Sequence, residues 1–133
     1  MKISRAAEVA TDPAGSEHFT GEVWMSPRVV PDSPTAMTVT TVTFSPGART
    51  HWHSHPGGQT LLVLEGRGRV RSAGGAGRAI AAGDAVWVSP GERHWHGADP
   101  DAQMIHVSVT IGDGTAWDDD AVSDADYLGD PTD

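Results

Sequence analysis

The sequence of 133 residues contains no cysteine, which excludes disulfides, thiolate catalysis and zinc sites built on cysteine. It also lacks any apolar stretch long enough to span a bilayer. The first residues lack the apolar core of a signal peptide, so we predict a cytoplasmic protein. The length fits one domain of ordinary size.

Positive charge is missing from the last part of the chain. Residues 99–133 contain 10 Asp and no Lys or Arg, whereas residues 1–98 contain 9 Lys and Arg against 8 Asp and Glu. The net charge of −9 therefore comes from one acidic run, which we interpret as a solvated surface. Because this surface repels phosphates and anionic lipids, we expect no nucleic acid and no membrane as a partner.

Long helical periodicity is also absent before the acidic run. Short strand patterns separated by Gly and Pro occur instead, which is typical of an all-β sandwich or barrel. The patterns are a run rich in Thr and Val at residues 36–45, short apolar runs at 59–65 and 85–88, and an alternating run at 103–111.

We expect residues 1–133 to form a single domain with three parts. These are an irregular arm at 1–20, a barrel core at 36–111 and an acidic tail at 112–133. Within the tail, residues 118–127 either form one short helix or stay loose.

The alternating run near the C-terminus has two distinct faces. One face is apolar and needs cover, which either a second sheet or a partner subunit can supply. The other face is mostly polar. The apolar face consists of Ile105, Val107, Val109 and Ile111, and the other of Met104, His106, Ser108 and Thr110.

Five of the seven histidines lie in two short clusters, at residues 51–55 and 94–96. Alternate residues of a strand point the same way, so His53 and His55 can converge on one point. Gln59 follows at the start of a buried strand and can offer its carbonyl oxygen, and His94 can close the site from another strand. Imidazole binds Mn, Fe, Co, Ni and Zn. The pattern favours a metal site over incidental surface histidines.

The same residues resemble the two motifs of the cupin superfamily. The segment GARTHWHSHPGGQTLLVLEG, at residues 47–66, has the spacing of the first motif, with Gln59 where most cupins carry Glu. The segment GDAVWVSPGERH, at residues 83–94, has that of the second. The resemblance implies a small cupin barrel, that is, a jelly roll or double-stranded β-helix. It also implies one divalent metal ion held by His53, His55, Gln59 and His94.

A narrower resemblance is to small cupins that include the bacterial manganese-dependent hydroxynitrile lyases. These also carry Gln in place of Glu and a His-Trp-His-Gly run, which here begins at His94. The resemblance implies an enzyme that cleaves or forms cyanohydrins such as mandelonitrile, giving an aldehyde and cyanide. It favours Mn over Fe, Co, Ni or Zn, and by analogy with small cupins it implies a homodimer.

The ligand set and the remaining histidines suggest a mechanism for this chemistry. Three neutral His and a neutral Gln leave the charge of the ion uncompensated, which strengthens it as a Lewis acid and weighs against oxygen chemistry. His96 shares a strand face with His94 and is our candidate general base. His106 either orients His96 or protonates the departing cyanide.

Strand parity and the resemblance together indicate a pocket wall made of Thr40, Val42, Thr50 and Thr110. Trp52 and Trp95 have the opposite parity to the proposed ligands, so we expect them to pack outside the barrel. Two other functions stay open at this point. One is a metal-dependent dioxygenase or other oxidative cupin acting on a small organic molecule, and the other is a non-catalytic cupin that binds a small molecule or metal.

Overall fold

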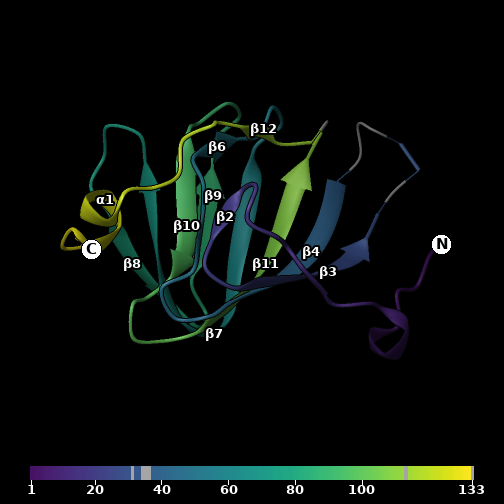
Figure 1. The fold of residues 1–133 in the computed structure, drawn as a ribbon. Helices are drawn as coiled ribbons and strands as arrows, with labels where there is room; N and C mark the ends of the chain where they lie inside the picture. The colour runs from purple at the N-terminus through teal and green to yellow at the C-terminus, as the bar shows by residue number, and fades with distance from the viewer. Residues whose placement is uncertain (31, 34–36, 113, 133) are drawn as a thin grey trace.

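The computed structural model describes residues 1–30, 32–33, 37–112 and 114–132, and within them twelve strands form one antiparallel sheet (Figure 1). The longer strands are β3 (Val23–Val29), β4 (Met37–Phe44), β7 (Gln59–Ser72), β10 (His94–Ala98) and β11 (Met104–Ile111). The shorter ones are β1 (Asp12–Pro13), β2 (Phe19–Thr20), β5 (Arg49–Thr50), β6 (His53–Ser54), β8 (Arg78–Ala81), β9 (Ala85–Val88) and β12 (Ala116–Trp117). A 3-10 helix, η1 (Ala6–Glu8), and an α-helix, α1 (Asp124–Leu128), complete the chain.

The sheet curls into an antiparallel half-barrel because β7 takes part in both of its halves. The first part of β7 pairs with β11 and β9, and the second part pairs with β10 and β8. Gly66 lies where the strand passes from one half to the other, at φ +73°, and a Cβ there would lie 1.8 Å from the carbonyl oxygen of Gln103. Only glycine fits this crossing. The predicted all-β jelly-roll fold is confirmed.

The alternation predicted for residues 103–111 is also confirmed, and the structure decides which face of β11 points inward. Met104, His106, Ser108 and Thr110 are buried. Ile105, Val107 and Val109 are half-buried, and Ile111 is exposed. The second half of the sheet therefore does not cover the apolar face, because the polar side of the strand faces the interior.

The N-terminal arm is more ordered than expected. The prediction of an irregular arm is wrong at residues 12–13, which pair with β3 as β1, and at residues 19–20, which pair with β5 as β2. The predicted start of the barrel core, residue 36, lies outside the described residues. Among the described residues, no helix has the length and apolar character needed to cross a membrane.

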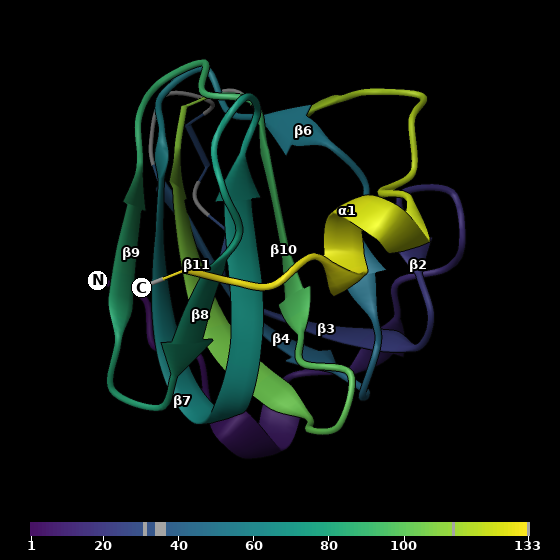
Figure 2. The same ribbon diagram turned by 90° about the vertical axis from the view of Figure 1, so that its left-hand side faces the viewer.

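Residues 118–128 form what we call the C-terminal strap, which includes α1. Most of its side chains are exposed, as expected of an acidic tail, but Val122 and Tyr127 are buried against Trp52 and Trp95. This cluster is separate from the main core, which confirms that the two tryptophans pack outside the barrel. Figure 2 shows α1 beside β10, to which Trp95 belongs, and the Tyr127 and Trp95 rings are in contact.

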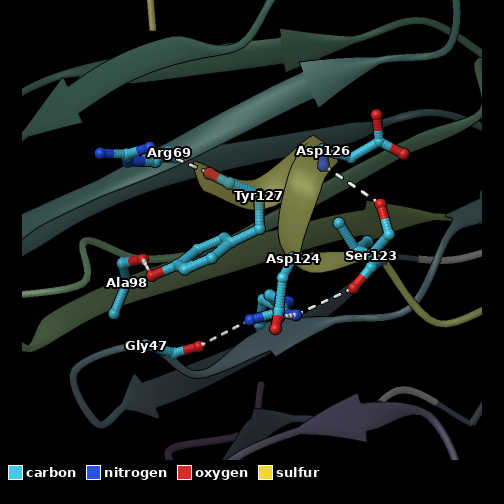
Figure 3. A network of polar contacts seen from close by, with 9 residues as sticks. Gly47, Arg69, Ala98, Ser123, Asp124, Asp126 and Tyr127 are labelled. Carbon is cyan, nitrogen blue, oxygen red and sulfur yellow. Dashed lines mark hydrogen bonds and ion pairs between the residues drawn. The ribbon is translucent and has the colours of Figure 1, made fainter. Parts of the chain in front are cut away.

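Arginines of the barrel strands hold the strap in place. Arg49, itself buried, donates to the Val122 carbonyl and pairs with Asp124 at 2.8 Å. Its guanidinium lies 4.3 Å from the centroid of the Tyr127 ring. The Tyr127 hydroxyl donates to the carbonyl of Ala98 at 2.7 Å (Figure 3). Ion pairs and hydrogen bonds therefore hold the strap together with the burial of Val122 and of the Tyr127 ring.

We predict that Tyr127→Ala lowers the free energy of unfolding by roughly 3–5 kcal/mol, the range for truncation of a buried aromatic side chain. The variant loses the buried ring together with its hydrogen bond to β10. Denaturant-induced unfolding measures the change. Leu128→Ala, at the exposed neighbouring position, is the matched control and should change the midpoint little. Equal effects of the two substitutions would show that the strap does not stabilise the barrel.

Candidate functional site

Five buried histidines converge inside the barrel from separate elements. His53 comes from β6, His55 from the loop after it, His94 and His96 from β10, and His106 from β11. The centroid of the His53 ring lies 5.0 Å from that of His55 and 4.3 Å from that of His94. Gln59 begins β7, and its Oε1 lies 3.2 Å from His94 Nε2. The structure thus brings together the four residues predicted as metal ligands.

Backbone carbonyls set the tautomers of three of these histidines. The Nδ1 atoms of His53, His55 and His94 face the carbonyl oxygens of His51 at 2.9 Å, Gly114 at 3.4 Å and Glu92 at 2.8 Å. A carbonyl only accepts, so each Nδ1 carries the proton and each Nε2 keeps its lone pair. A carbonyl partner on the second ring nitrogen is the usual support of a metal-binding histidine.

The contact between His94 and Gln59 indicates whether a cation fits between their side chains. His94 Nε2 has no proton to give when Nδ1 donates to Glu92, and Gln59 Oε1 is also an acceptor. The Gln59 amide nitrogen donates to the Thr110 hydroxyl at 3.1 Å, which turns the oxygen toward His94. Two lone pairs therefore face each other. His55 Nε2 is buried and has no partner among the described residues. A divalent metal ion fits this donor set.

His96 belongs to two groups of histidines: the candidate metal group with His53 and His94, and a hydrogen-bonded pair with His106. One ring nitrogen each of His53, His94 and His96 lies within 4.8 Å of the other two. On its other side, His96 Nδ1 lies 3.0 Å from His106 Nε2, so one proton is shared between the two rings. His96 Nε2 and His106 Nδ1 are buried without a partner among the described residues. The pair can therefore accept or release a proton at its two outer nitrogens.

Burial keeps these histidines neutral. It lowers the pKa of His94 and of His106 from 6.5 to about 4. It also lowers the pKa of His55, and that of His53 and His96 well below the ordinary value, with neighbouring histidines adding to the effect for the last two. At neutral pH the rings are therefore uncharged. An uncharged ring nitrogen with a free lone pair can bind a metal ion or accept a proton.

The predicted pocket residues all line one cavity of about 240 Å³ beside the histidines. Thr40, Val42, Thr50 and Thr110 are part of its wall. Thr38, Phe44 and Ser108 belong to it as well, and strand parity with Thr40 and His106 could have identified them. Sequence reasoning also missed Phe19, Met25, Gly112, Gly114, Thr115 and Trp117.

Two further histidines lie outside the cluster. His51 is only half-buried, and its contribution to the site is the backbone carbonyl that holds His53. His18 is also half-buried because its ring stacks on Trp117, with 4.4 Å between centroids and 5° between the ring planes.

Comparison with known proteins identifies the family of this chain. The sequence profile of the cupin domain matches residues 40–110. The chain belongs to the cupin family. The (R)-mandelonitrile lyase of Granulicella tundricola is 45% identical to this cupin over 109 residues, which cover 82% of this chain and 83% of the relative.

Solved structures share the fold of this cupin. A cupin-like protein of Thermotoga maritima superposes with a TM-score of 0.83 at 38% identity, over 86% of this chain and 89% of that one. The polyketide cyclase RemF of Streptomyces resistomycificus superposes with a TM-score of 0.74 at 19% identity, over 96% of this chain and 90% of that one. The second likeness concerns the fold alone.

We predict that the metal-free protein loses stability as the pH falls below 6.5. The pKa of each buried histidine is lower in the fold than in the unfolded chain, so the unfolded chain binds more protons in this range. For His94 and for His106 the loss reaches about 2 kcal/mol by pH 5. Thermal unfolding of the metal-free protein between pH 8 and 5 measures it, and His106→Gln should flatten the dependence. A melting temperature that is constant down to pH 5 would contradict the prediction.

Proposed function

We propose that this cupin is a metal-dependent C–C lyase of the hydroxynitrile lyase type, which cleaves or forms cyanohydrins resembling mandelonitrile. The observation that carries the proposal is the pairing of two features in one cavity: a set of uncharged metal donors and a hydrogen-bonded histidine pair. The 45% identity to a named (R)-mandelonitrile lyase supports the same reaction.

The metal we propose is one divalent ion, with Mn favoured over Fe, Co, Ni or Zn, on His53, His55, Gln59 and His94. Among the described residues, the cluster of potential ligands contains no carboxylate. When bound, such an ion supplies Lewis-acid stabilisation of negative charge on oxygen or on cyanide. The Gln59 amide stays oriented through its hydrogen bond to Thr110.

His96 and His106 move the proton in the proposed reaction. His96 is neutral because of burial, so it can take the hydroxyl proton of the cyanohydrin. The oxygen then forms the aldehyde carbonyl as the electron pair of the C–C bond leaves with cyanide, and the same proton returns to give hydrogen cyanide. His106 holds the His96 ring through the 3.0 Å contact and sets which of its nitrogens is protonated.

The cavity suits a small substrate. Its volume of about 240 Å³ lies below the range of roughly 300–1,000 Å³ common for ligand pockets. Hydroxyl groups line one part of the wall, on Thr40, Thr50 and Thr110, and Val42 adds an apolar part. A compact molecule with one polar and one apolar end matches this wall.

We predict that Mn-loaded protein releases cyanide from racemic mandelonitrile, and that metal-free protein and His96→Ala do so far more slowly. Loss of a general base costs roughly 10²–10⁴-fold in rate. Metal analysis of each variant accompanies the kinetics, since a base can be removed without loss of metal. His51→Ala, at a half-buried position outside the cavity, is the matched control and should keep the wild-type rate.

Equal cyanide release by all three samples would overturn the proposed reaction. If His96→Ala loses the metal, His96 is a ligand and not the base. A reaction that instead requires Fe and consumes oxygen would make this protein an oxidative cupin, and tight metal binding without turnover of any substrate would make it a binding protein.

We further propose a homodimer that uses the outer face of the sheet, in a cytoplasmic protein. Most outward residues of β4, β11 and the first part of β7 are uncharged, although the chain carries a net charge of −9; the exception is Glu65, which is exposed and lies opposite Ile105. Leu62 and Leu64 of β7 and Trp87 of the neighbouring β9 are exposed by 43%, 48% and 59%. A largely apolar face is self-complementary about a two-fold axis, and an acidic chain can bring two copies together there with few opposing carboxylates.

We predict that the wild-type protein elutes as a dimer and that Leu62→Arg shifts it to a monomer, because the substitution places a cation in the centre of the apolar face. Light scattering coupled to size-exclusion chromatography gives the mass directly. Leu128→Arg, on the exposed side of the strap, is the control and should leave the dimer intact. A monomeric wild type would refute this interface.

A further inference from the structure

Each end of the chain adds a short strand to a strand that carries the site. β2 pairs with β5, so that Phe19 lies opposite Thr50, and β12 pairs with β6, so that Trp117 lies opposite His53. Directly opposed residues of an antiparallel pair place their side chains on the same face. Phe19 and Trp117 accordingly line the cavity. Both lie outside residues 40–110, the part of the chain that matches the cupin domain.

The side chains of Phe19 and Trp117 pack together with the imidazole rings beside them. The Trp117 ring lies 5.5 Å from that of Phe19, edge to face, and 4.7 Å from that of His53. His18 stacks on Trp117, and the carbonyl of His18 accepts a hydrogen bond from the His51 amide at 2.8 Å. The two ends of the chain therefore meet in one aromatic wall beside the metal cluster.

The C-terminal strap anchors Trp117 from behind. The next residue, Asp118, donates its amide to the Trp52 carbonyl at 3.0 Å, and its carboxylate pairs with Arg93. The Arg93 guanidinium lies 4.3 Å from the centroid of the Trp52 ring. Beyond this point the strap continues into the contacts of Tyr127 with the barrel (Figure 3). The chain on the C-terminal side of Trp117 is thus fixed against the barrel.

The part of the wall that β3, β4 and β11 supply has a mixed chemistry. Thr38, Thr40 and Thr110 present hydroxyl groups there, beside the apolar side chains of Met25, Val42 and Phe44. A substrate whose reacting carbon lies at the histidines must direct its organic substituent toward one side or the other. Edge-to-face and offset contacts between aromatic rings are favourable beyond the burial of area, so a flat ring gains more from the wall of Phe19 and Trp117 than a methyl group does.

From this placement we propose that Trp117 and Phe19 are the residues that set substrate preference, by packing against the substituent on the reacting carbon and favouring an aryl group over a short alkyl group. The proposal rests on the proposed lyase function and deepens it. It places the residues that set substrate preference in the two terminal segments, outside residues 40–110, the part of the chain that matches the cupin domain.

The test compares mandelonitrile, which carries a phenyl group, with lactonitrile, which carries a methyl group, on Mn-loaded protein. Trp117→Ala should raise KM for mandelonitrile about tenfold, as the loss of one aromatic contact allows, and leave KM for lactonitrile within about twofold. Trp117→Phe should recover most of the preference. Trp24→Ala, at a position 40% exposed outside the cavity, is the matched control and should behave as wild type.

A binding measurement separates this proposal from the reaction. Calorimetric titration of the Mn-loaded protein with benzoate and with acetate reports the same preference without turnover, and metal analysis checks that each variant is fully loaded. Weaker binding of benzoate alone by Trp117→Ala supports the wall even if no cyanide is ever released. Equal weakening of both carboxylates, or none, in fully loaded protein overturns it. Should Trp117→Ala fail to retain metal, Phe19→Leu decides by the same comparison.

Discussion

Five imidazole rings share the interior of this small barrel. Because burying them in charged form is costly, the rings are neutral, and the surrounding structure must provide partners for their nitrogens. Burial lowers the pKa of all five, so the rings are neutral and each must place two nitrogens without the help of water. Carbonyl groups of the turns satisfy one nitrogen of His53, His55 and His94. The remaining nitrogens point inward and have nothing to bind except a cation, a substrate or one another. Among the described residues, the buried histidine nitrogens without a partner belong to His55, His96 and His106, and all three residues line the cavity.

The same constraint explains why β11 turns its mostly polar face inward and its apolar face outward, the reverse of an ordinary amphipathic strand. His106, Ser108 and Thr110 must face the cavity, so the apolar residues Val107 and Val109 face outward. An apolar exterior then needs its own cover, which is the physical basis for the proposed dimer. The acidic charge of the chain is kept on a different surface. In the C-terminal strap, Asp118, Asp124 and Asp126 meet Arg93, Arg49 and Arg71 of the barrel. Three of the carboxylates in the acidic run thus hold the strap, and none of these three lines the cavity.

Prediction from sequence succeeded where a periodic pattern governs the structure. The histidine spacing, the parity of Thr40 and Val42 and the two faces of β11 all follow from the two-residue repeat of a strand. It failed at Phe19 and Trp117, because a strand of two residues has no repeat and its position depends on pairing with β5 and β6, far away in sequence. A short helix was one of two expectations for residues 118–127 and is present as α1, but the packing of the strap on the barrel was missed for a similar reason. Acidic runs are usually solvated, and nothing local indicates that Arg49 is buried beneath one.

The side-chain amide of Gln59 connects the proposed metal ligands with the wall of the cavity. Its nitrogen donates to Thr110, a hydroxyl of the cavity wall, and its oxygen faces His94 at 3.2 Å. A carboxylate at this position would have no N–H to give Thr110 and would bring a negative charge to the donor set. The amide instead ties the orientation of the wall to the metal cluster and leaves the positive charge of an ion available to an anion, such as an alkoxide or cyanide. In an oxygen-activating site that excess of charge is a disadvantage, because it disfavours the higher-valent metal states. This neutral donor is one of the features on which the proposed lyase function rests, and the hydrogen bond to Thr110 makes the cavity wall part of the same arrangement.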